Sequence, residues 1–285
     1  MSPRRAGHPP VVAAIAGSDP SGGAGMQADL KTMSALGAYG CAVITALTAQ
    51  STRGVTGVHA VPADFVRHQV ETLVEDVALD AVKVGMLATA DIIGVVAELT
   101  ATTLTCPVVL DPVMVATSGD RLLDETAVDA LRTLIPLVDA VTPNIPEAAA
   151  LLGSPPATSL DAMRDQATAL HAAGARRVLL KGGHSTPEQD RTGAGEVVDV
   201  WVDEGGLYEV RGRRVTTSNS HGTGDTLSSA LASLLPQRTS WLDAVIEAKA
   251  WLTDALAGAD ALDIGAGPGP VHHFHALWPA IEVGS

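Results

Sequence analysis

Aromatic residues and positive charge are both scarce in this sequence. Phe, Trp and Tyr together make only 3% of its 285 residues, so a core would be built mainly from Ala, Val and Leu. Hydrophobic residues still make 46% of the chain, enough to bury a large core in one α/β domain or in two small ones. The net charge of −14 argues against nucleic acid or an anionic membrane as a partner. A phosphate ligand would therefore need a local device, such as backbone amides, a lysine or a metal ion.

Cysteines and long apolar runs are also few. Cys41 and Cys106 both lie in apolar stretches, which favours buried packing residues in a reducing cytoplasm over a disulfide. Arg4 and Arg5 precede the run VVAAIAG, which faintly imitates a signal peptide but is short and leads straight into a glycine-rich loop. No stretch approaches the roughly 20 apolar residues of a membrane span. We expect a cytoplasmic protein with no membrane partner.

Short apolar runs alternate with amphipathic segments along most of the chain. The runs are almost continuously apolar, as strands covered on both faces are, and they occupy residues 11–17, 41–47, 81–85, 107–112, 139–144 and 176–183. The amphipathic segments lie near residues 26–37, 63–77, 90–101, 124–134, 146–152 and 159–173. This alternation is typical of βαβ units. It predicts an α/β fold with a central, mostly parallel sheet flanked by helices on both faces.

The pattern changes between residues 195 and 216. Partial alternation of apolar and polar residues around the segment EGG predicts a hairpin or an edge pair of strands. Two helices should follow, over residues 224–235 and 241–257. Because no long linker or repeat interrupts the chain, we expect one domain from residue 10 to residue 285, after a flexible tail of residues 1–9.

Polar and small residues follow each predicted strand of the parallel sheet. They include Gly17, Gln50, Met86, Asp111, Asn144, Glu147 and Lys181. In an open α/β sheet, ligands bind outside the carboxyl ends of the strands. Ordinary turns and helix caps could explain any one of these positions, but six successive polar strand ends favour a ligand site.

The segment HGTGDT, residues 221–226, lies at the start of a predicted helix. Gly222 and Gly224 would let the backbone approach a ligand closely, and the amides of residues 222–225 would form an anion hole at the helix N-terminus. Asp225 would stay ionised in the first helical turn and could accept a proton from a hydroxyl that attacks a phosphate. The alternative is a simple N-cap formed by Thr223 or Asp225.

The glycine-rich loop of residues 17–32, GSDPSGGAGMQADLKT, matches neither common nucleotide-binding pattern. It lacks the Lys of a P-loop and the G-x-G-x-x-G spacing of a dinucleotide site, and no acidic residue ends the second strand. A dinucleotide-dependent dehydrogenase is therefore disfavoured. The loop could instead close over a small polar substrate.

Four further positions carry open alternatives. Gln50 can donate and accept at once, which suits the edge of a heterocycle, but it could be a solvated turn residue. Asn144 and Glu147 could serve Mg²⁺ or simply begin a helix. Lys181, which closes a buried strand, favours a ligand contact. The run HHFH, residues 272–275, has no nearby Cys, Asp or Glu, so we do not expect it to bind a metal.

Taken together, these stretches resemble the hydroxymethylpyrimidine/phosphomethylpyrimidine kinases of thiamine biosynthesis, a family of the ribokinase-like superfamily. The resemblance runs from about Val11 to Trp278. Its motifs are AGSDPSGGAGMQADLKTMSALGAYG, VITALTAQST, VKVGMLAT, VVLDPVM, TPNIPEA, LLKGGH, HGTGDTLSSAL and GPVHHFHALW. The first of these is long and specific.

The resemblance implies a ribokinase-like sheet, usually in a homodimer, and two phosphorylations at one site. ATP would phosphorylate 4-amino-5-hydroxymethyl-2-methylpyrimidine on its hydroxymethyl group and then phosphorylate the monophosphate to the diphosphate. By motif, Gln50 would hydrogen-bond the pyrimidine, with Gly17, Asp29, Met86 and Val113 around it. Asp111, Asn144 and Glu147 would serve Mg²⁺ and the phosphates. ATP would contact Lys181, Asn144, Thr223 and Gly224, and residues 222–225 would form the anion hole.

One position departs from the family pattern. The family usually has cysteine where this chain has Asp225, whereas aspartate is the rule in the wider superfamily and is its catalytic base. The substitution favours Asp225 as the general base and leaves pyridoxal kinase as an alternative, because pyridoxal is a heterocyclic alcohol of similar size. A catalytically idle ligand-binding protein on the same fold is a further alternative, but it predicts a damaged site.

Overall fold

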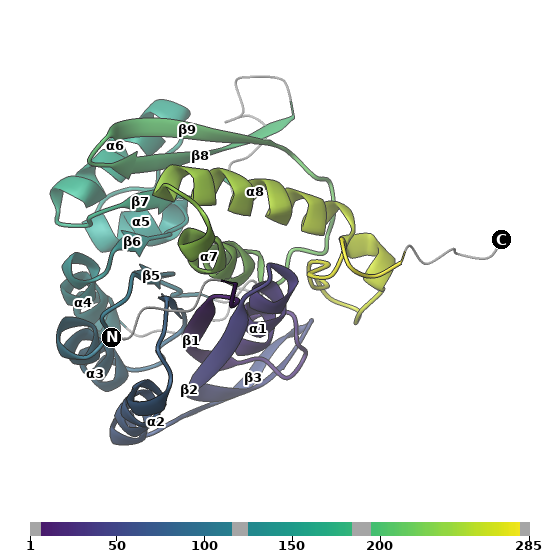
Figure 1. Ribbon diagram of the computed structural model, residues 1–285. Helices are drawn as coiled ribbons and strands as arrows, with labels where there is room; N and C mark the ends of the chain where they lie inside the picture. Colours follow the sequence, from purple (N-terminus) through teal and green to yellow (C-terminus); the bar gives the residue numbers. More distant parts are fainter. Residues whose placement is uncertain (1–6, 116–124, 184–194, 280–285) are drawn as a thin grey trace.

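One nine-stranded sheet runs through the centre of the molecule (Figure 1). The computed structural model describes residues 7–115, 125–183 and 195–279. The strands are β1 (Val11–Ser18), β2 (Tyr39–Ser51), β3 (Gly54–Ala60), β4 (Ala81–Val84), β5 (Val108–Leu110), β6 (Ala140–Val141), β7 (Val178–Leu180), β8 (Glu196–Asp203) and β9 (Gly206–Arg213). Their order across the sheet is β3-β2-β1-β4-β5-β6-β7-β8-β9.

The six central strands are parallel, β3 and β8 each pair antiparallel with an outer strand of this group, and β9 pairs antiparallel with β8. The strands β2, β1, β4, β5, β6 and β7 form the parallel part. β3 pairs antiparallel with β2, and the predicted hairpin of β8 and β9 extends the other side of the sheet. The chain moves from β1 to β2 on one side and then returns to β4 on the other side of β1. This reversal is a topological switch point, where ligands bind in open α/β sheets.

Helices cover both faces of the sheet, as the sequence predicts. They are α1 (Gly25–Ala35), α2 (Ala63–Asp76), α3 (Ala90–Thr102), α4 (Glu125–Leu134), α5 (Ile145–Leu152), α6 (Leu160–Ala172), α7 (Thr223–Leu234) and α8 (Trp241–Ala257), with short 3-10 turns η1 (Ile135–Leu137), η2 (Leu235–Gln237) and η3 (Ala259–Leu262). Helices α2 to α6 pack on one face, and α1, α7 and α8 pack on the other (Figure 1). On β1, Ala13 and Ile15 face the first group, whereas Val12 and Ala14 face the second. This two-sided burial is why the strands appear as continuous apolar runs.

Strand β3 was not expected from the sequence. The segment GVTGVHA is exposed over most of its length, so it lacks the apolar alternation that marks a half-buried strand. It forms because β2 continues to Ser51 and offers its edge for pairing. Gln50 therefore lies in a strand and not in a solvated turn.

Two smaller expectations also changed or stay open. Cys41 and Cys106 are free thiols, as predicted, and they are partly buried where burial was expected. Residues 1–6 of the predicted tail lie outside the described residues, and the single domain from residue 10 to residue 285 stays a prediction. No helix within the described ranges combines the length and apolarity that crossing a bilayer requires.

Candidate active site

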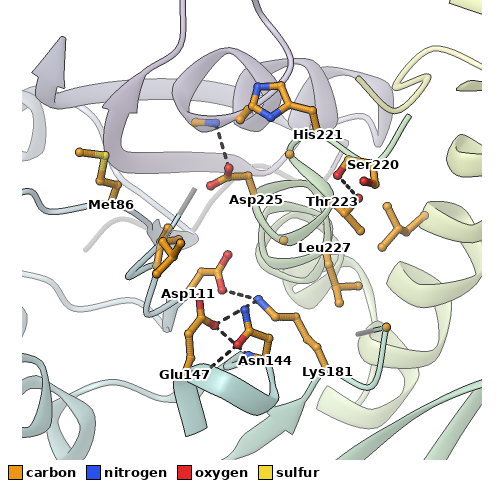
Figure 2. A pocket seen from close by; sticks show the side chains of 18 of the residues that line it. Met86, Asp111, Asn144, Glu147, Lys181, Ser220, His221, Thr223, Asp225 and Leu227 are labelled. Atoms are coloured by element: carbon orange, nitrogen blue, oxygen red, sulfur yellow. Dashed lines mark hydrogen bonds and ion pairs between the residues drawn. The ribbon is translucent and has the colours of Figure 1, made fainter. Parts of the chain in front are cut away.

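A cavity of about 950 Å³ opens along the carboxyl ends of the parallel strands. It is lined by the predicted positions Gly17, Gln50, Met86, Asp111, Val113, Asn144, Glu147, Lys181, Gly222, Thr223, Gly224 and Asp225. Figure 2 shows Asp225 on one side of this space and the group of Asp111, Glu147 and Lys181 on the other. The prediction that polar strand ends gather at one edge of the sheet is therefore met by the geometry.

The N-terminus of α7 presents free backbone amides to the cavity. Its N-cap is Gly222, which has φ 75° and no side-chain cap. A Cβ on Gly222 would lie 1.9 Å from the carbonyl oxygen of Gly23, so only glycine fits there. The amide of Thr223 donates to the carbonyl of Ser220 at 3.2 Å, so the prediction that the amides of residues 222–225 together form the anion hole is wrong for Thr223. The amides of Gly224 and Asp225 are in the first turn, where no helical carbonyl can accept from them.

Asp225 is not a helix cap. Its Oδ2 accepts a hydrogen bond from the amide of Gly25 at 3.0 Å, and its Oδ1 accepts one from Lys83 Nζ at 2.8 Å. Burial raises the pKa of Asp225, but the charge and hydrogen bond of Lys83 outweigh burial and leave the pKa below its usual value. The carboxylate is therefore ionised at neutral pH, and 16% of the side chain is exposed toward the cavity.

Lys181 lies between two carboxylates across the cavity. Its Nζ donates to Asp111 Oδ1 at 2.7 Å and lies 4.0 Å from Glu147 Oε2. Burial lowers the pKa of Lys181, but the negative charges of Asp111 and Glu147 outweigh burial and leave the pKa above its usual value. The lysine is therefore charged. A Cβ built on Gly224 would lie 3.3 Å from Lys181 Nζ and 3.2 Å from Asp111 Oδ2. The ammonium of Lys181, the free amides of α7 and the Asp111 carboxylate thus border the same space, which suits an anion accompanied by a cation.

Asn144 and Glu147 form a capping box at the start of α5. The Asn144 side chain accepts from the amide of Glu147 at 2.8 Å, and Glu147 Oε2 accepts from the amide of Asn144 at 2.8 Å. The helix-start interpretation is therefore correct as geometry. Glu147 also lines the cavity, and burial raises its pKa to about 7, against the lowering effect of Lys181. A cation bound close to Glu147 would lower this pKa and favour the ionised carboxylate.

Gln50 lies beside a buried His221–Asp19 pair. His221 Nε2 is 2.8 Å from Asp19 Oδ2 and 3.4 Å from Gln50 Nε2. The closer carboxylate can only accept, so the imidazole nitrogen carries the proton toward Asp19 and cannot accept from Gln50. Burial raises the pKa of Asp19, but hydrogen bonds from His221 and Ser21 lower it to about 2. The amide nitrogen of Gln50 is left available to a ligand.

Three residues near the cavity were not predicted from the sequence, and one predicted residue lies away from the cavity. Asp19 and His221 were within the quoted motifs but had been given no role. Lys83 interrupts a fully buried apolar strand, the same signal that singled out Lys181. Asp29 does not line the cavity; it is fully buried and contacts Lys83 and Ser229. In the HHFH run, His273 is buried with its Nε2 3.1 Å from Thr226 Oγ1, and burial lowers its pKa to about 3.

Comparison with known proteins gives a consistent result. The family model described as phosphomethylpyrimidine kinase matches residues 19–272. A protein of Escherichia coli K12 named hydroxymethylpyrimidine/phosphomethylpyrimidine kinase is 53% identical over 93% of this chain and 97% of its own length. The thiamine biosynthesis multifunctional protein ThiED of Corynebacterium efficiens is 47% identical over 97% of this chain and 38% of its own length.

A solved structure confirms the fold. Pyridoxal kinase from Staphylococcus aureus, in complex with ADP, superposes with a TM-score of 0.84 and 33% identity, covering 95% of this chain and 96% of that one. The expected ribokinase-like architecture of a mostly parallel sheet between helices is therefore correct. The family model and the relatives agree over nearly the whole length, so the resemblance of the motifs is confirmed, and the chain belongs to the phosphomethylpyrimidine kinase family.

Proposed function

We propose that this kinase transfers the γ-phosphoryl group of ATP to the hydroxymethyl group of 4-amino-5-hydroxymethyl-2-methylpyrimidine, and then to the resulting monophosphate, in thiamine biosynthesis. One observation carries the proposal. The ionised carboxylate of Asp225 faces a cavity beside the free amides of Gly224 and Asp225, with charged Lys181 on the other side. A base beside an anion hole is what transfer of a phosphoryl group to an alcohol requires.

The phosphates of ATP fit the half of the cavity between α7 and α5. Lys181 supplies a positive charge there, and the N-terminus of α7 supplies amides and the positive end of its dipole. Thr223, Gly224 and Asn144 line the same half. In the S. aureus relative the complex contains ADP, which supports a nucleotide site in this fold.

The pyrimidine fits the other half, near β1 and β2. Gln50 offers its amide nitrogen as a donor to the ring edge, and Gly17, Met86 and Val113 lie around it. The Gln50 Oε1 already accepts from Thr48 Oγ1 at 3.1 Å and has a second lone pair for the ring. Met86 lies at the edge of this half, away from Lys181 (Figure 2). Asp29, which was expected beside the substrate, is assigned an indirect role because it does not line the cavity.

The transfer step follows from this placement. The substrate hydroxyl donates its proton to Asp225 as its oxygen attacks the γ-phosphorus and the bond to the β-phosphate oxygen breaks, releasing ADP. The amides of residues 224 and 225 and Lys181 stabilise the charge on the transferring group. In the second round the acceptor is a phosphate whose second pKa is about 6, so its oxygen is already ionised and needs no base.

The residues present fit a magnesium ion. Asp111 and Glu147 place two carboxyl groups against the single charge of Lys181. The group keeps one negative charge when Glu147, whose pKa burial raises to about 7, is ionised. Within the described residues no cluster of three or more His, Cys, Asp or Glu side chains could hold a metal. Mg²⁺ is commonly bound by one or two carboxylates with water and phosphate oxygens, which suits Asp111 and Glu147 with Asn144 beside them. When bound, the ion neutralises phosphate charge.

We further propose a cytoplasmic homodimer that meets at the β3 edge of the sheet. β3 contains no charged residue, whereas the opposite edge strand β9 carries Glu209, Arg211 and Arg213. An uncharged edge strand readily pairs with another chain. Leu47 on β2 and Val58 on β3 are 51% and 49% exposed, which supports a contact there.

Pyridoxal kinase is the second candidate, because the S. aureus protein shares the fold at a TM-score of 0.84. The test is to give purified protein ATP and Mg²⁺ with either the pyrimidine alcohol or pyridoxal, and to identify products by mass. We expect mono- and diphosphate from the pyrimidine and a lower kcat/KM for pyridoxal. A higher kcat/KM for pyridoxal would make the second candidate correct, and no product from either alcohol would indicate a ligand-binding protein.

A further inference from the structure

A line of three charged side chains from three elements lies at the back of the cavity. Its members are Asp29, Lys83 and Asp225. Lys83 on β4 donates from Nζ to Asp29 Oδ1 at 2.8 Å and Oδ2 at 3.0 Å, and to Asp225 Oδ1 at 2.8 Å. Lys83 and Asp29 are fully buried, and neither lines the cavity. Ser229 on α7 donates to Asp29 Oδ1 at 2.6 Å and holds the far end of the line.

The sheet explains why Lys83 points this way. In β4, Val82 and Val84 pack with the helices α2 to α6, so Lys83 between them faces α1 and α7. Those two helices carry Asp29 and Asp225. Burial lowers the pKa of Lys83, but the three carboxylates of Asp225, Asp29 and Asp111 raise it above its usual value. A buried ammonium is tolerated only with such partners.

We propose that Lys83 is a positioning residue for the base at position 225, and that Asp29 limits how strongly Lys83 holds it. The proposal rests on the proposed function, in which Asp225 accepts the substrate proton. Lys83 fixes Oδ1 and the amide of Gly25 fixes Oδ2, so the orientation of the carboxylate is set while part of it lines the cavity.

Lys83 keeps a carboxylate partner both before and after proton transfer. Burial raises the pKa of Asp29 to about 7, so its carboxylate is ionised above that pH. Two carboxylates and one ammonium then carry a net charge of −1, and Asp225 is the member that reaches the cavity. When the hydroxyl proton moves to Asp225 and the phosphoryl group moves to the hydroxyl oxygen, the line becomes neutral. Lys83 then pairs with Asp29 alone, so no buried cation is left without a partner.

Several charged groups surround Asp225, and the sign of each determines whether it favours or opposes ionisation of the carboxylate. Lys83 on β4 and Lys181 beyond β7 favour the ionised carboxylate. Asp29 on α1 opposes it, because the charges of these two carboxylates repel. Asp111 beyond β5 acts on Lys83, and His273 near the C-terminus faces Asp225 as a buried neutral imidazole. Neutralising Asp29 should therefore strengthen the hold of Lys83, and removing Lys83 should weaken it.

A thiol at position 225 reports this effect without relying on kinase activity. Asp225→Cys is compared with Asp225→Cys/Asp29→Asn, and the alkylation rate at position 225 is followed against pH by peptide mass, which separates it from Cys41 and Cys106. The thiol pKa should lie below its ordinary value of about 8.5, and it should fall by roughly one more unit with Asp29→Asn, a tenfold rise in thiolate. Equal thiol pKa values in the two proteins would overturn the role of Asp29.

The second arm uses the kinase reaction with the natural base. Lys83→Met/Asp29→Asn removes a neutral pair, so the variant buries no unpaired charge other than Asp225. Relative to wild type at the same pH and at saturating Mg²⁺, its kcat with the alcohol should fall at least tenfold between pH 8 and pH 5. Turnover of the monophosphate at pH 8, where the acceptor phosphate is ionised and needs no base, serves as the folding control. A wild-type pH profile would show that Lys83 is only structural. If instead Asp225→Asn keeps normal kcat with the alcohol, the proposed base is wrong, which is a distinct failure.

Discussion

A carboxylate at position 225 changes what its surroundings must supply. A cysteine needs activation to accept a proton at neutral pH, because a thiol has a pKa near 8.5. Asp225 is already ionised, with Lys83 at 2.8 Å and the Gly25 amide at 3.0 Å. Both donors lower its pKa, so it is a weak base in the ground state. A loose phosphoryl-transfer transition state tolerates this, because little proton transfer is needed early.

The first residue-scale prediction separates the two phosphorylations. Asp225→Asn keeps the shape of the side chain and removes the base, so kcat with the alcohol should fall by about 10²–10⁴-fold while both KM values change little. The monophosphate supplies an ionised oxygen, so kcat for the second step should fall less than tenfold. Single-turnover measurements with each acceptor test this. An equal loss in both steps would indicate that Asp225 positions the phosphates and does not act as a base.

The second residue-scale prediction concerns Gln50. Its amide nitrogen has no acceptor on His221, because His221 Nε2 donates to Asp19. Gln50→Ala should leave polar groups of the pyrimidine unpaired, at a cost of about 1–3 kcal/mol, seen mainly as a higher KM for the pyrimidine with the KM for ATP preserved. Ser51→Ala is the matched control, because Ser51 is the next residue of β2 and is exposed. An unchanged pyrimidine KM in Gln50→Ala would remove this residue from the substrate site.

At the scale of elements, two helix starts divide the work at the phosphate end. The N-cap of α7 is a glycine, which leaves the amides of its first turn free for a ligand. The N-cap of α5 is Asn144, and the capping box closes on itself. Glu147 in that box also lies 4.0 Å from Lys181 and reaches the cavity. One helix start therefore offers donors for the phosphates, and the other offers a carboxylate for the cation.

The element-scale prediction tests the start of α5. Glu147→Gln can keep the hydrogen bond from the Asn144 amide but loses its charge, so the Mg²⁺ concentration for half-maximal rate should rise several-fold. Because burial raises the pKa of Glu147 to about 7, the effect should be larger at pH 8, where the wild-type carboxyl is ionised, than at pH 6. Asp161→Asn is the control, since Asp161 is a first-turn acid of α6 with an exposed side chain. A Mg²⁺ dependence that does not move would leave Glu147 as a capping residue only.

At the scale of the whole molecule, the sheet has two different edges. β3 ends one side without a charged residue, and the β8–β9 hairpin ends the other side with ion pairs such as Arg211–Glu196. Charged residues protect an edge strand from pairing. The β3 edge is therefore where a second copy would add to the sheet or cover it.

The proposed dimer contact can be tested with one variant at each edge of the sheet. Val58→Asp on β3 should shift the protein from dimer to monomer in sedimentation velocity, because it places a charge in the proposed contact. Leu207→Asp on β9, where the side chain is 39% exposed, should remain dimeric. A monomeric wild type would make the dimer prediction wrong. Dissociation by Leu207→Asp alone would move the interface to the other edge.

From the sequence alone one can predict most of the helices and strands, and most of the positions that line the cavity. Continuous apolar runs such as residues 11–17 predicted buried strands, because each must be covered on both faces. The glycines and the carboxylate of HGTGDT predicted an anion hole, because only a close backbone approach needs them. Lining positions at strand ends followed from the rule for parallel sheets. These features are local, so they can be read from adjacent residues.

The tertiary structure decided what depends on residues far apart in the chain. β3 is too exposed for a sequence signal and exists because β2 offers an edge. Asp29 sits behind the site, and Lys83 joins it to Asp225, 142 positions further along than Lys83. No local pattern encodes that contact, since it needs β4 to place Lys83 between α1 and α7. A buried charge must find its partner wherever the fold brings one, and only the packed molecule shows which carboxylates share this lysine.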